Sequence, residues 1–411
     1  MMNRIKTIRR AALVALVATA GCSEVLSLDV EAPGRIADDD LNSGEAVSGL
    51  VAGMSYDLSQ AIDGALQEIL LAGGDLWHSG SYDFGTYPRG ILLQAPEDWD
   101  GEYGSFQQAR WVAEDGLRRI ADILEPAAFE ANRHVARGYL MAGFANRWLG
   151  ENQCSSTIDG GPEVPNTEHF NRADSLFSRA IAVGTAAGRN EIVQAAYGGR
   201  ASIRAWLGNW AGATADAQQV DADFVYLAIF STTSGAVLND LVDETTDRKE
   251  FTVYNTMWES VTDDPRVPWR VVFDNSGQVE KGQDGETDFY QQLKFLTEDD
   301  DIPLTKGTEM LVLRAEAALR GGDIGGMVAL LDAARDEYGM DPIAEVPGTE
   351  AAAWELLRTE RAATVWLEGR RLWDLRRWKQ AGAPQADPYA ADRDTCFPIS
   401  REETRVNPNL G

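Results

Sequence analysis

The spacing of apolar residues constrains the fold most, because they recur at intervals of three and four along most of the chain after residue 45. Between Arg137 and Gly150, for example, Leu140, Phe144 and Trp148 fall on one face of a helix. A strand would instead alternate apolar and polar residues. The pattern therefore predicts a mainly α-helical protein.

Two stretches combine this spacing with glycine-rich turns. Residues 195–220 read AAYGGRASIRAWLGNWAGATADAQQV, with Gly208 and Asn209 between two helical runs. Residues 308–339 repeat the design around a Gly-Gly-Asp turn. Each resembles a tetratricopeptide-type helical hairpin. Because such hairpins are irregularly spaced here, we expect them inside one large domain rather than in an open solenoid.

The amino terminus has the pattern of a lipoprotein leader. Four basic residues precede AALVALVATA, a ten-residue apolar run that is too short to span a bilayer. The ending V-A-T-A-G-C resembles the lipobox of bacterial lipoproteins, which predicts cleavage after residue 21 and acylation of Cys22. Ser23 is compatible with outer-membrane delivery. An ordinary signal peptide with an incidental cysteine is the alternative. We expect residues 22–45 to form a tether.

Charge and composition exclude several function classes. The chain has 65 acidic and 37 basic side chains, a net charge of −28, and removal of the leader makes it −32. Such a field repels phosphate backbones, so we expect no nucleic-acid partner. The three histidines lie far apart, and no phosphate-binding loop, dinucleotide fingerprint or nucleophile elbow is present. We therefore expect no metal site and no cofactor.

Two long segments are rich in aromatic residues but lack helical periodicity, namely residues 73–103 and about 231–301. Ordered loops of this length inside a compact domain usually carry function. At the end of the first segment and just after it, Trp99, Tyr103 and Phe106 have helical spacing, so we assign them to packing.

A family resemblance appears in the last hundred residues. The stretch from Glu355 to Gly382, ELLRTERAATVWLEGRRLWDLRRWKQAG, and the closing CFPISREETRVNPNL from Cys396 resemble motifs of the SusD/RagB family of outer-membrane nutrient-binding lipoproteins. Asp264-Pro265-Arg266, the hairpin near residue 315 and the lipobox are similar too. The resemblance covers essentially the whole mature chain, more loosely at residues 155–170 and 225–250.

The resemblance implies a SusD-like fold, with tetratricopeptide-like hairpins and long ordered loops in residues 46–411. We divide this domain into an N-terminal part (46–225), a loop-rich part (226–305) and a C-terminal part (306–411). It further implies a lipid-anchored, non-enzymatic protein of the outer membrane that faces the cell exterior and passes an oligosaccharide or other nutrient to a SusC-like TonB-dependent transporter. A lipid-anchored glycan hydrolase and a tetratricopeptide-type envelope scaffold are the alternatives.

Candidate ligand contacts lie in the two aromatic-rich segments. Proteins that hold sugars use aromatic rings as platforms beside hydrogen-bonding side chains. The loop after the first helices, where family members build part of their ligand surface, offers six candidates, and the second segment offers three more. The alternative is that these rings pack inward as loop anchors. The candidates are Asp75, Trp77, His78, Tyr82, Asp83, Tyr87, Trp258, Trp269 and Tyr290.

The charged residues of the C-terminal motif suggest structure rather than catalysis. Glu360, Arg361, Glu368 and Asp374 alternate with further arginines and with tryptophans. A neighbouring arginine lowers the pKa of a carboxylate, which makes it a poor proton donor. We therefore predict an ion-pair network that holds the helices together, and a structural role for Arg266.

Cys154 and Cys396 remain after acylation of Cys22. Both are expected outside the reducing cytoplasm, so we predict that they form a disulfide. Two buried, unpaired cysteines are the alternative.

Two acidic runs, Asp38 to Asp40 and Glu298 to Asp301, resemble calcium ligand sets in composition alone. We favour simpler readings. The first run suits a helix start, where negative charge is favourable, and the second suits solvated surface.

Overall fold

The computed structural model describes residues 38–80, 84–94, 97–233 and 235–410. The chain divides into two units, residues 1–42 and residues 43–411. In the first, the described part is a short 3-10 helix, η1 (Asp38–Asn42). The leader with Cys22 and Ser23, and the candidates Tyr82 and Asp83, lie outside the described residues. None of the helices that the structure describes has the length and apolar character needed to cross a membrane.

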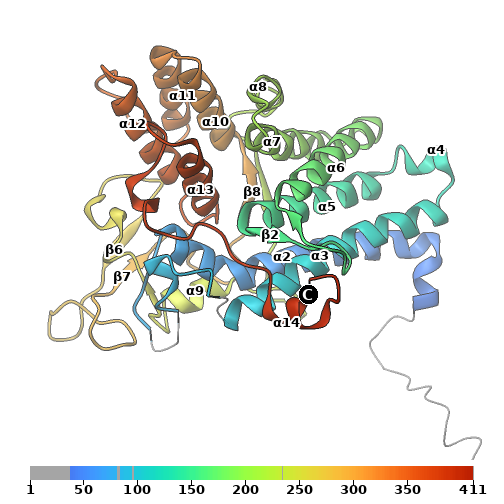
Figure 1. Cartoon of the computed structure of the whole chain (residues 1–411), viewed down its shortest axis with the longest axis horizontal. Coiled ribbons are helices and arrows are strands. Elements are labelled where there is room, and N and C mark those ends of the chain that lie inside the picture. Colours follow the sequence, from blue (N-terminus) through green and yellow to red (C-terminus); the bar gives the residue numbers. More distant parts are fainter. Residues whose placement is uncertain (1–37, 81–83, 95–96, 234, 411) are drawn as a thin grey trace, which may run out of the picture. The chain divides into compact units, whose positions relative to one another are not determined.

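The second unit is mainly helical, as predicted (Figure 1). Its longer helices coincide with the apolar periodicity of the sequence. The helices are η2 (Gly44–Ala46), α2 (Val47–Gly73), η3 (Tyr87–Arg89), α3 (Glu97–Ile123), α4 (Pro126–Phe129), α5 (Arg133–Asn152), α6 (Thr167–Ala186), α7 (Asn190–Trp206), α8 (Trp210–Ala217), α9 (Asp240–Thr245), η4 (Met257–Ser260), α10 (Gly307–Arg320), α11 (Ile324–Asp336), α12 (Glu350–Thr364), α13 (Arg371–Ala381), η5 (Pro388–Ala390) and α14 (Arg401–Val406).

Short antiparallel strand pairs fasten the loops to this helical body. Each pair joins segments that are apart in sequence, so the long loops are ordered by backbone hydrogen bonds. The pairs are β1 (Trp77–His78) with β5 (Phe251–Thr252), β2 (Ser155–Ser156) with β3 (Val164–Pro165), β4 (Val225–Ala228) with β8 (Ile302–Lys306), and β6 (Trp269–Val271) with β7 (Tyr290–Gln292).

Both predicted helical hairpins are present, as α7 with α8 and α10 with α11. Gly208 ends the first helix of one hairpin with a φ of 80°, which glycine adopts without strain. Asn209 then caps α8 by accepting a hydrogen bond from the Gly212 amide at 3.0 Å. Asp323 caps α11 in the same way through the Gly326 amide at 2.7 Å.

The three aromatic residues assigned to packing are buried on α3. Trp99 is 1% exposed and stacks on Phe397, with ring centroids 3.7 Å apart. Phe106 stacks on Trp148 of α5. The C-terminal segment therefore packs directly against the N-terminal helices.

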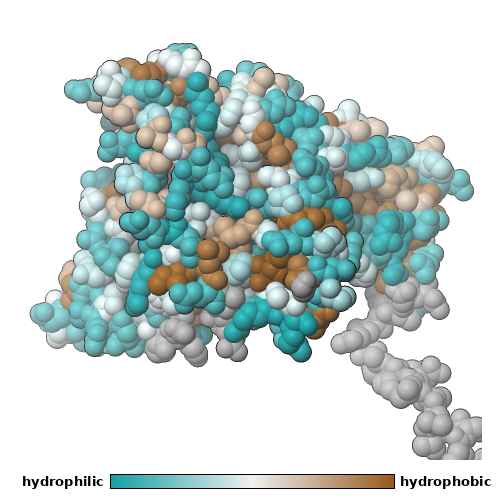
Figure 2. Space-filling view, viewed as in Figure 1, coloured by the Kyte–Doolittle hydropathy of each residue, from teal (hydrophilic) through white to brown (hydrophobic). Residues whose placement is uncertain are grey.

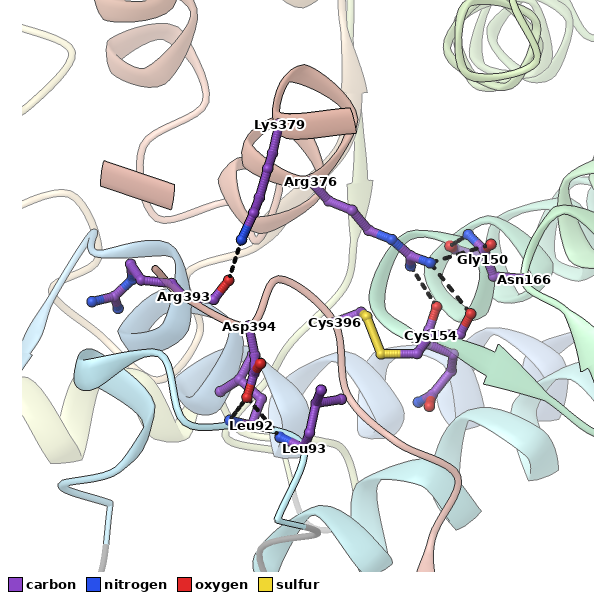
Figure 3. Close-up of a disulfide and its surroundings, with 11 residues drawn as sticks. Leu92, Leu93, Gly150, Cys154, Asn166, Arg376, Lys379, Arg393, Asp394 and Cys396 are labelled. Atoms are coloured by element: carbon purple, nitrogen blue, oxygen red, sulfur yellow. Dashed lines mark hydrogen bonds between the residues drawn. A yellow bond between two sulfur atoms is a disulfide. The ribbon is translucent and has the colours of Figure 1, made fainter. Parts of the chain in front are cut away.

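The predicted disulfide between Cys154 and Cys396 is present in the structure and strengthens this closure (Figure 3). It joins the segment after α5 to the C-terminal segment across 242 positions of sequence. Beside it, the Cys154 amide donates to the Phe397 carbonyl at 2.8 Å, and Arg376 of α13 donates to the Gln153 carbonyl at 2.6 Å. The disulfide thus lies within a hydrogen-bonded junction of three segments.

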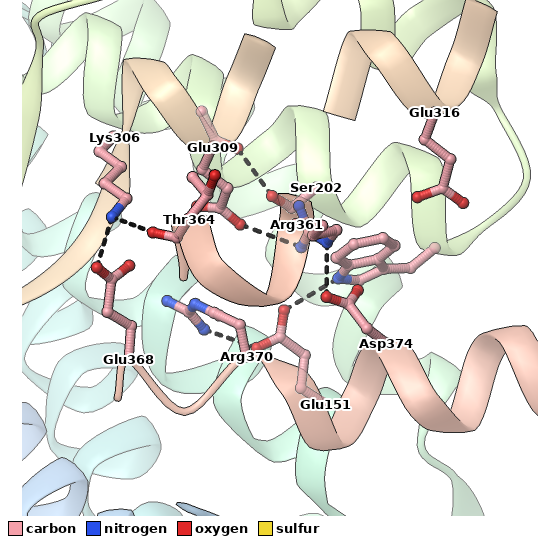
Figure 4. Close-up of polar contacts among 12 residues, drawn as sticks. Glu151, Ser202, Lys306, Glu309, Glu316, Arg361, Thr364, Glu368, Arg370 and Asp374 are labelled. Carbon is pink, nitrogen blue, oxygen red and sulfur yellow. Dashed lines mark hydrogen bonds and ion pairs between the residues drawn. The ribbon is translucent and has the colours of Figure 1, made fainter. Parts of the chain in front are cut away.

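The charged residues of the C-terminal motif form the predicted ion-pair network (Figure 4). We define the buried arginine network as Arg147, Arg361, Arg370 and Arg377, together with the acids Glu151, Glu309, Glu316 and Asp374. Arg377 contacts both oxygens of Glu316, at 2.5 and 2.7 Å. Burial would raise the pKa of Glu316, but Arg377, Arg320 and Arg361 together outweigh burial and lower it to about 2.

The network links helices from both halves of the unit, because Glu151 of α5 pairs with Arg370 at 2.7 Å. Arg370 lies in the break between α12 and α13, where Leu367 and Gly369 have positive φ values. Arg266 also has a structural role, since it pairs with Asp264 and with Glu360 at 2.6 Å each.

The surface of the second unit is largely polar on the face that can be seen. The face in Figure 2 is mostly hydrophilic, with several separate apolar patches. The acidic run at residues 298–301 is not simply solvated, however. Asp299, Asp300 and Asp301 accept backbone amide hydrogen bonds, among them one from Phe230 to Asp301 at 2.7 Å. The run is therefore partly exposed, as expected for surface, and it also fastens loops.

Candidate ligand-binding site

A ladder of three aromatic rings lies at the hairpin of β6 and β7, which carries two of the rings, while the third follows β5. The strand register pairs Trp269 with Gln292 and Val271 with Tyr290, so Trp269 and Tyr290 are diagonal neighbours on one face. Their rings stack at a centroid distance of 5.2 Å and an interplanar angle of 2°. Tyr254 meets Tyr290 edge-on at 5.3 Å. All three side chains are partly exposed, and Trp269 and Tyr290 also pack against the hydrophobic core, so part of the ladder is open to solvent.

Backbone and side-chain hydrogen bonds hold the ladder in place. The indole nitrogen of Trp269 donates to the Val261 carbonyl at 2.7 Å. The amide of Tyr290 donates to the Thr252 hydroxyl at 2.8 Å, and the amide of Val253 donates to the Tyr290 carbonyl at 2.9 Å. Rings fixed in this way lose little conformational entropy when a ligand stacks on them.

The hairpin extends the apolar surface beyond the ladder. Phe273 lies four residues after Trp269, and an isolated bridge pairs it with Val279 in the segment between β6 and β7. Alternation along a strand places residues i and i+4 on the same face. Phe273 is 61% exposed, so the chain after β6 carries a further ring that is open to solvent.

Polar groups border the ladder. The pKa of Tyr290 is raised, first by partial burial and then by the charges of Asp288, Glu259 and Tyr254. The phenol is therefore protonated at neutral pH and has a hydrogen bond to donate. Asp288 pairs with Lys281 at 2.5 Å on the exposed part of the same hairpin. The site thus combines flat apolar faces with hydroxyl and carboxylate groups.

Three of the predicted ligand contacts are wrong as surface contacts, because they are buried. Trp258 and Tyr87 are 0% exposed and Asp75 is 1% exposed. Trp258 donates its indole hydrogen to Asp75 at 3.4 Å, and Arg371 lies 3.9 Å from the same carboxylate. Burial raises the pKa of Asp75 to about 6, although Arg371 opposes the shift. These side chains support the loops from beneath.

The first loop contributes less than expected in the part that the structure describes. His78 keeps only 13% of its side chain exposed and packs edge-on against Phe84, with ring centroids 6.0 Å apart. Its location agrees with the inward-packing alternative. Trp77 is partly exposed on β1, and β1 connects through β5 to the strand that carries Tyr290.

Among the sequence candidates, the structure brings Trp269 and Tyr290 together, and it adds Tyr254 and Phe273. Both added residues lie in the second aromatic-rich segment. The alternation of Trp269, Val271 and Phe273 on an extended stretch was a signal for the latter. Tyr254 had no comparable signal, because its partner Tyr290 lies 36 positions away.

Comparisons with known proteins agree with this fold. Residues 291–395 match the model of the SusD family. A SusD superfamily protein from Bacteroides thetaiotaomicron is 15% identical with a TM-score of 0.65, covering 90% of this chain and 97% of that chain. One from Parabacteroides distasonis is 12% identical with a TM-score of 0.65, covering 92% and 99%.

A SusD-like carbohydrate binding protein from Bacteroides vulgatus is 12% identical with a TM-score of 0.61, and the alignment covers 81% of this chain and 83% of that chain. No curated protein matches the sequence. At these identities the likeness to the solved structures establishes the fold.

Proposed function

We propose that this chain, whose residues 291–395 match the SusD family and whose fold is similar to that of SusD superfamily proteins, is a surface lipoprotein that binds a glycan and passes it to a SusC-like TonB-dependent transporter. We propose further that it is not an enzyme and that its acylated Cys22 anchors it in the outer membrane. The lipobox-like leader supports the anchor, and one structural relative is described as carbohydrate binding.

The observation that carries the glycan proposal is the ring ladder of Tyr254, Tyr290 and Trp269. Sugars have flat apolar faces edged by hydroxyl groups, and stacked aromatic side chains beside polar groups match both features. The fixed, partly exposed rings of the hairpin provide such a surface. An oligosaccharide or polysaccharide fits an open hairpin better than a small buried metabolite does, because the rings line an exposed face.

Affinity electrophoresis in gels that contain a panel of polysaccharides tests this proposal, with each gel also assayed for released sugars. We expect retardation by at least one polysaccharide and no release of sugar. Trp269→Ala and Tyr290→Ala should each weaken the interaction by about tenfold, since each removes a stacking face.

Trp111→Ala is the matched control, because Trp111 is an aromatic side chain on α3 that is 47% exposed and not part of the hairpin. Thermal unfolding of each variant checks that the fold is kept. Equal retardation of Trp269→Ala, Tyr290→Ala and the control would exclude the ladder as the site. Release of sugar would favour the hydrolase alternative.

The transporter partner needs a separate measurement. Detergent extraction of the acylated protein from its own membrane, followed by affinity capture through the lipoprotein, should bring down a TonB-dependent receptor. A neighbouring gene for such a receptor would support the pairing. Capture without any receptor would favour the scaffold alternative.

A further inference from the structure

We propose that a pocket between the N-terminal ends of α5 and α7 and strand β4 binds a tetrahedral oxyanion, in the form of a phosphate or sulfate ester. This site is independent of the ring ladder. In Figure 1 the hairpin of β6 and β7 lies at the left of the molecule, whereas α4, which leads into α5, lies at the right. The proposal therefore goes beyond the proposed glycan binding and does not depend on it.

The pocket has a volume of about 540 Å³ and a wall of basic side chains. Arg133, His134 and Arg137 come from the first turns of α5, and Arg189 comes from the N-cap position of α7. One acidic residue, Glu191, also lines it. Three arginines beside one carboxylate are an exception in a chain that has 28 more acidic than basic side chains.

Two of these arginines have no carboxylate partner among the described residues. Arg133 donates its Nε to the ring of His134 at 3.2 Å and makes no ion pair there. The Nε atom of Arg137 is buried and has no hydrogen-bond partner among the residues that the structure describes. A buried donor without a partner costs free energy, and an anion in the pocket would remove that cost.

The third arginine is held only loosely. Arg189 pairs with Glu191 at 2.7 Å, but their side chains are 43% and 46% exposed. Exposed pairs of this kind contribute little to stability, so Arg189 is free to turn toward a bound anion.

The field in the pocket is positive from several directions. The amino ends of α5 and α7, helices of 20 and 17 residues, both line it, and such ends favour anions. The pKa of His134 is lowered, first by burial and then by the charges of Arg133, Arg137 and Arg189. The three guanidinium groups thus act together on one location.

The guanidinium donors and the apolar rim of the pocket indicate which class of ligand fits. A carboxylate has two oxygens and is satisfied by one arginine, whereas a phosphate or sulfate ester has three terminal oxygens for three guanidinium groups. The volume exceeds the need of a bare phosphate and leaves room for the organic part of an ester. Val225 and Ile229, which are 47% and 54% exposed, offer that part an apolar rim.

Isothermal titration of the purified protein tests the proposal, with glucose 6-phosphate, inorganic phosphate, sulfate and unmodified glucose as probes at constant ionic strength. We expect glucose 6-phosphate to bind and glucose not to bind. Arg133→Gln and Arg137→Gln should each raise the dissociation constant by at least about tenfold, since each removes charge-assisted hydrogen bonds.

Arg405→Gln is the matched control, because it removes the same charge from an exposed pair on α14. Ile229→Glu is a second variant that should weaken binding without touching the core, because it adds a negative charge at the exposed rim. If Arg137→Gln fails to fold, Arg133→Gln and Ile229→Glu still decide the matter.

A vesicle-binding assay distinguishes a lipid headgroup from a soluble ester as the ligand. The Cys22→Ala chain, which no acyl group anchors, is sedimented with phosphatidylcholine vesicles with and without phosphatidic acid. Binding only to phosphatidic acid would assign the pocket to a lipid headgroup, and binding of glucose 6-phosphate would assign it to soluble esters. The proposal is overturned if no phosphate or sulfate probe binds, or if Arg405→Gln weakens binding as much as the pocket variants do.

Discussion

Two regions of this molecule are rich in arginine, and they differ in whether the guanidinium groups are paired with carboxylates. In the buried arginine network, every guanidinium contacts at least one carboxylate within 3.5 Å. In the pocket at the start of α5, Arg133 and Arg137 contact no carboxylate that the structure describes, although the chain has acidic residues in excess. The difference separates arginines that hold the fold from arginines available to a ligand.

The physical reason is solvation. A guanidinium that is removed from water loses its hydration, and only close carboxylates and carbonyls compensate for it. Arg147, Arg361 and Arg370 are at most 2% exposed, so their partners are obligatory. Arg133 is exposed to water and needs no partner for the fold. The free protein therefore tolerates Arg133 without a carboxylate partner. The unpaired guanidinium remains available to bind an anion from solution.

The largest effect is expected at the centre of the network. Glu316→Gln leaves Arg377 buried without its bidentate partner and also removes the contact of Arg320. Breaking one side of a buried pair costs about 3 to 5 kcal/mol, so the free energy of unfolding should fall by that amount. Chemical denaturation at pH 7 measures it.

Glu402→Gln is the control, because Glu402 pairs with Arg405 on the surface and both side chains are about 70% exposed. Its effect should be at most about 1 kcal/mol. A loss of similar size in both variants would mean that burial does not distinguish the network from surface pairs.

A smaller effect is expected at Asp63, a buried acid for which no described cation provides an ion pair. Asp63 is 5% exposed and accepts a hydrogen bond from the Asp240 amide at 3.0 Å. Burial, together with the charges of Asp240 and Glu102, raises its pKa from 3.8 to about 8. The carboxyl group is therefore neutral in the folded protein at pH 7.

The sign of the pH dependence follows from proton binding. Between pH 4 and pH 8 the unfolded chain releases this proton while the folded chain keeps it, so this group lowers stability as pH rises. Asp63→Asn has no proton to release and keeps an oxygen for the Asp240 amide. Its stability relative to the wild type should increase from pH 5 to pH 8.5, by roughly 2 to 4 kcal/mol.

Denaturant unfolding at both pH values measures the Asp63 effect. Asp122→Asn, at an exposed carboxyl group on α3, controls for the loss of one negative charge. A pH-independent difference between Asp63→Asn and the wild type would show that Asp63 is ionised in the folded protein.

Local patterns were sufficient to predict the helices, both hairpins and the ion-pair character of the C-terminal motif. The helices and hairpins depend on residues close in sequence, such as Gly208 and Asn209 at the turn of a hairpin. The acidic partners of the motif are distant, since Glu151 and Arg370 lie 219 positions apart. The disulfide followed from the small number of remaining cysteines. Side-chain direction in the long loops could not be predicted in this way. For example, the buried side chains of Trp258 and Asp75 contact each other although they lie 183 positions apart in sequence.

The basic pocket shows the same limit. Arg133 and Arg137 are four residues apart, so their common face on a helix can be read from the sequence. Arg189 joins them only because α6 returns the chain to the start of α5, and no local pattern reports that return. The ring ladder likewise depends on the register of β6 with β7, which an 18-residue connection leaves open.

The smallest effect on stability is expected for variants of the unpaired pocket arginines. These variants also test the comparison of the two regions most directly. Without a ligand, Arg133→Gln and Arg137→Gln leave no carboxylate without its partner, so each should change the free energy of unfolding by less than about 1 kcal/mol. Arg377→Gln, in contrast, removes the bidentate partner of the buried Glu316, which keeps only Arg320 and the Trp378 indole, and should cost about 3 to 5 kcal/mol. Denaturation in a buffer free of phosphate and sulfate measures all three. A large loss for the pocket variants would mean that these arginines hold the fold as the network does, and the division between the two regions would no longer stand.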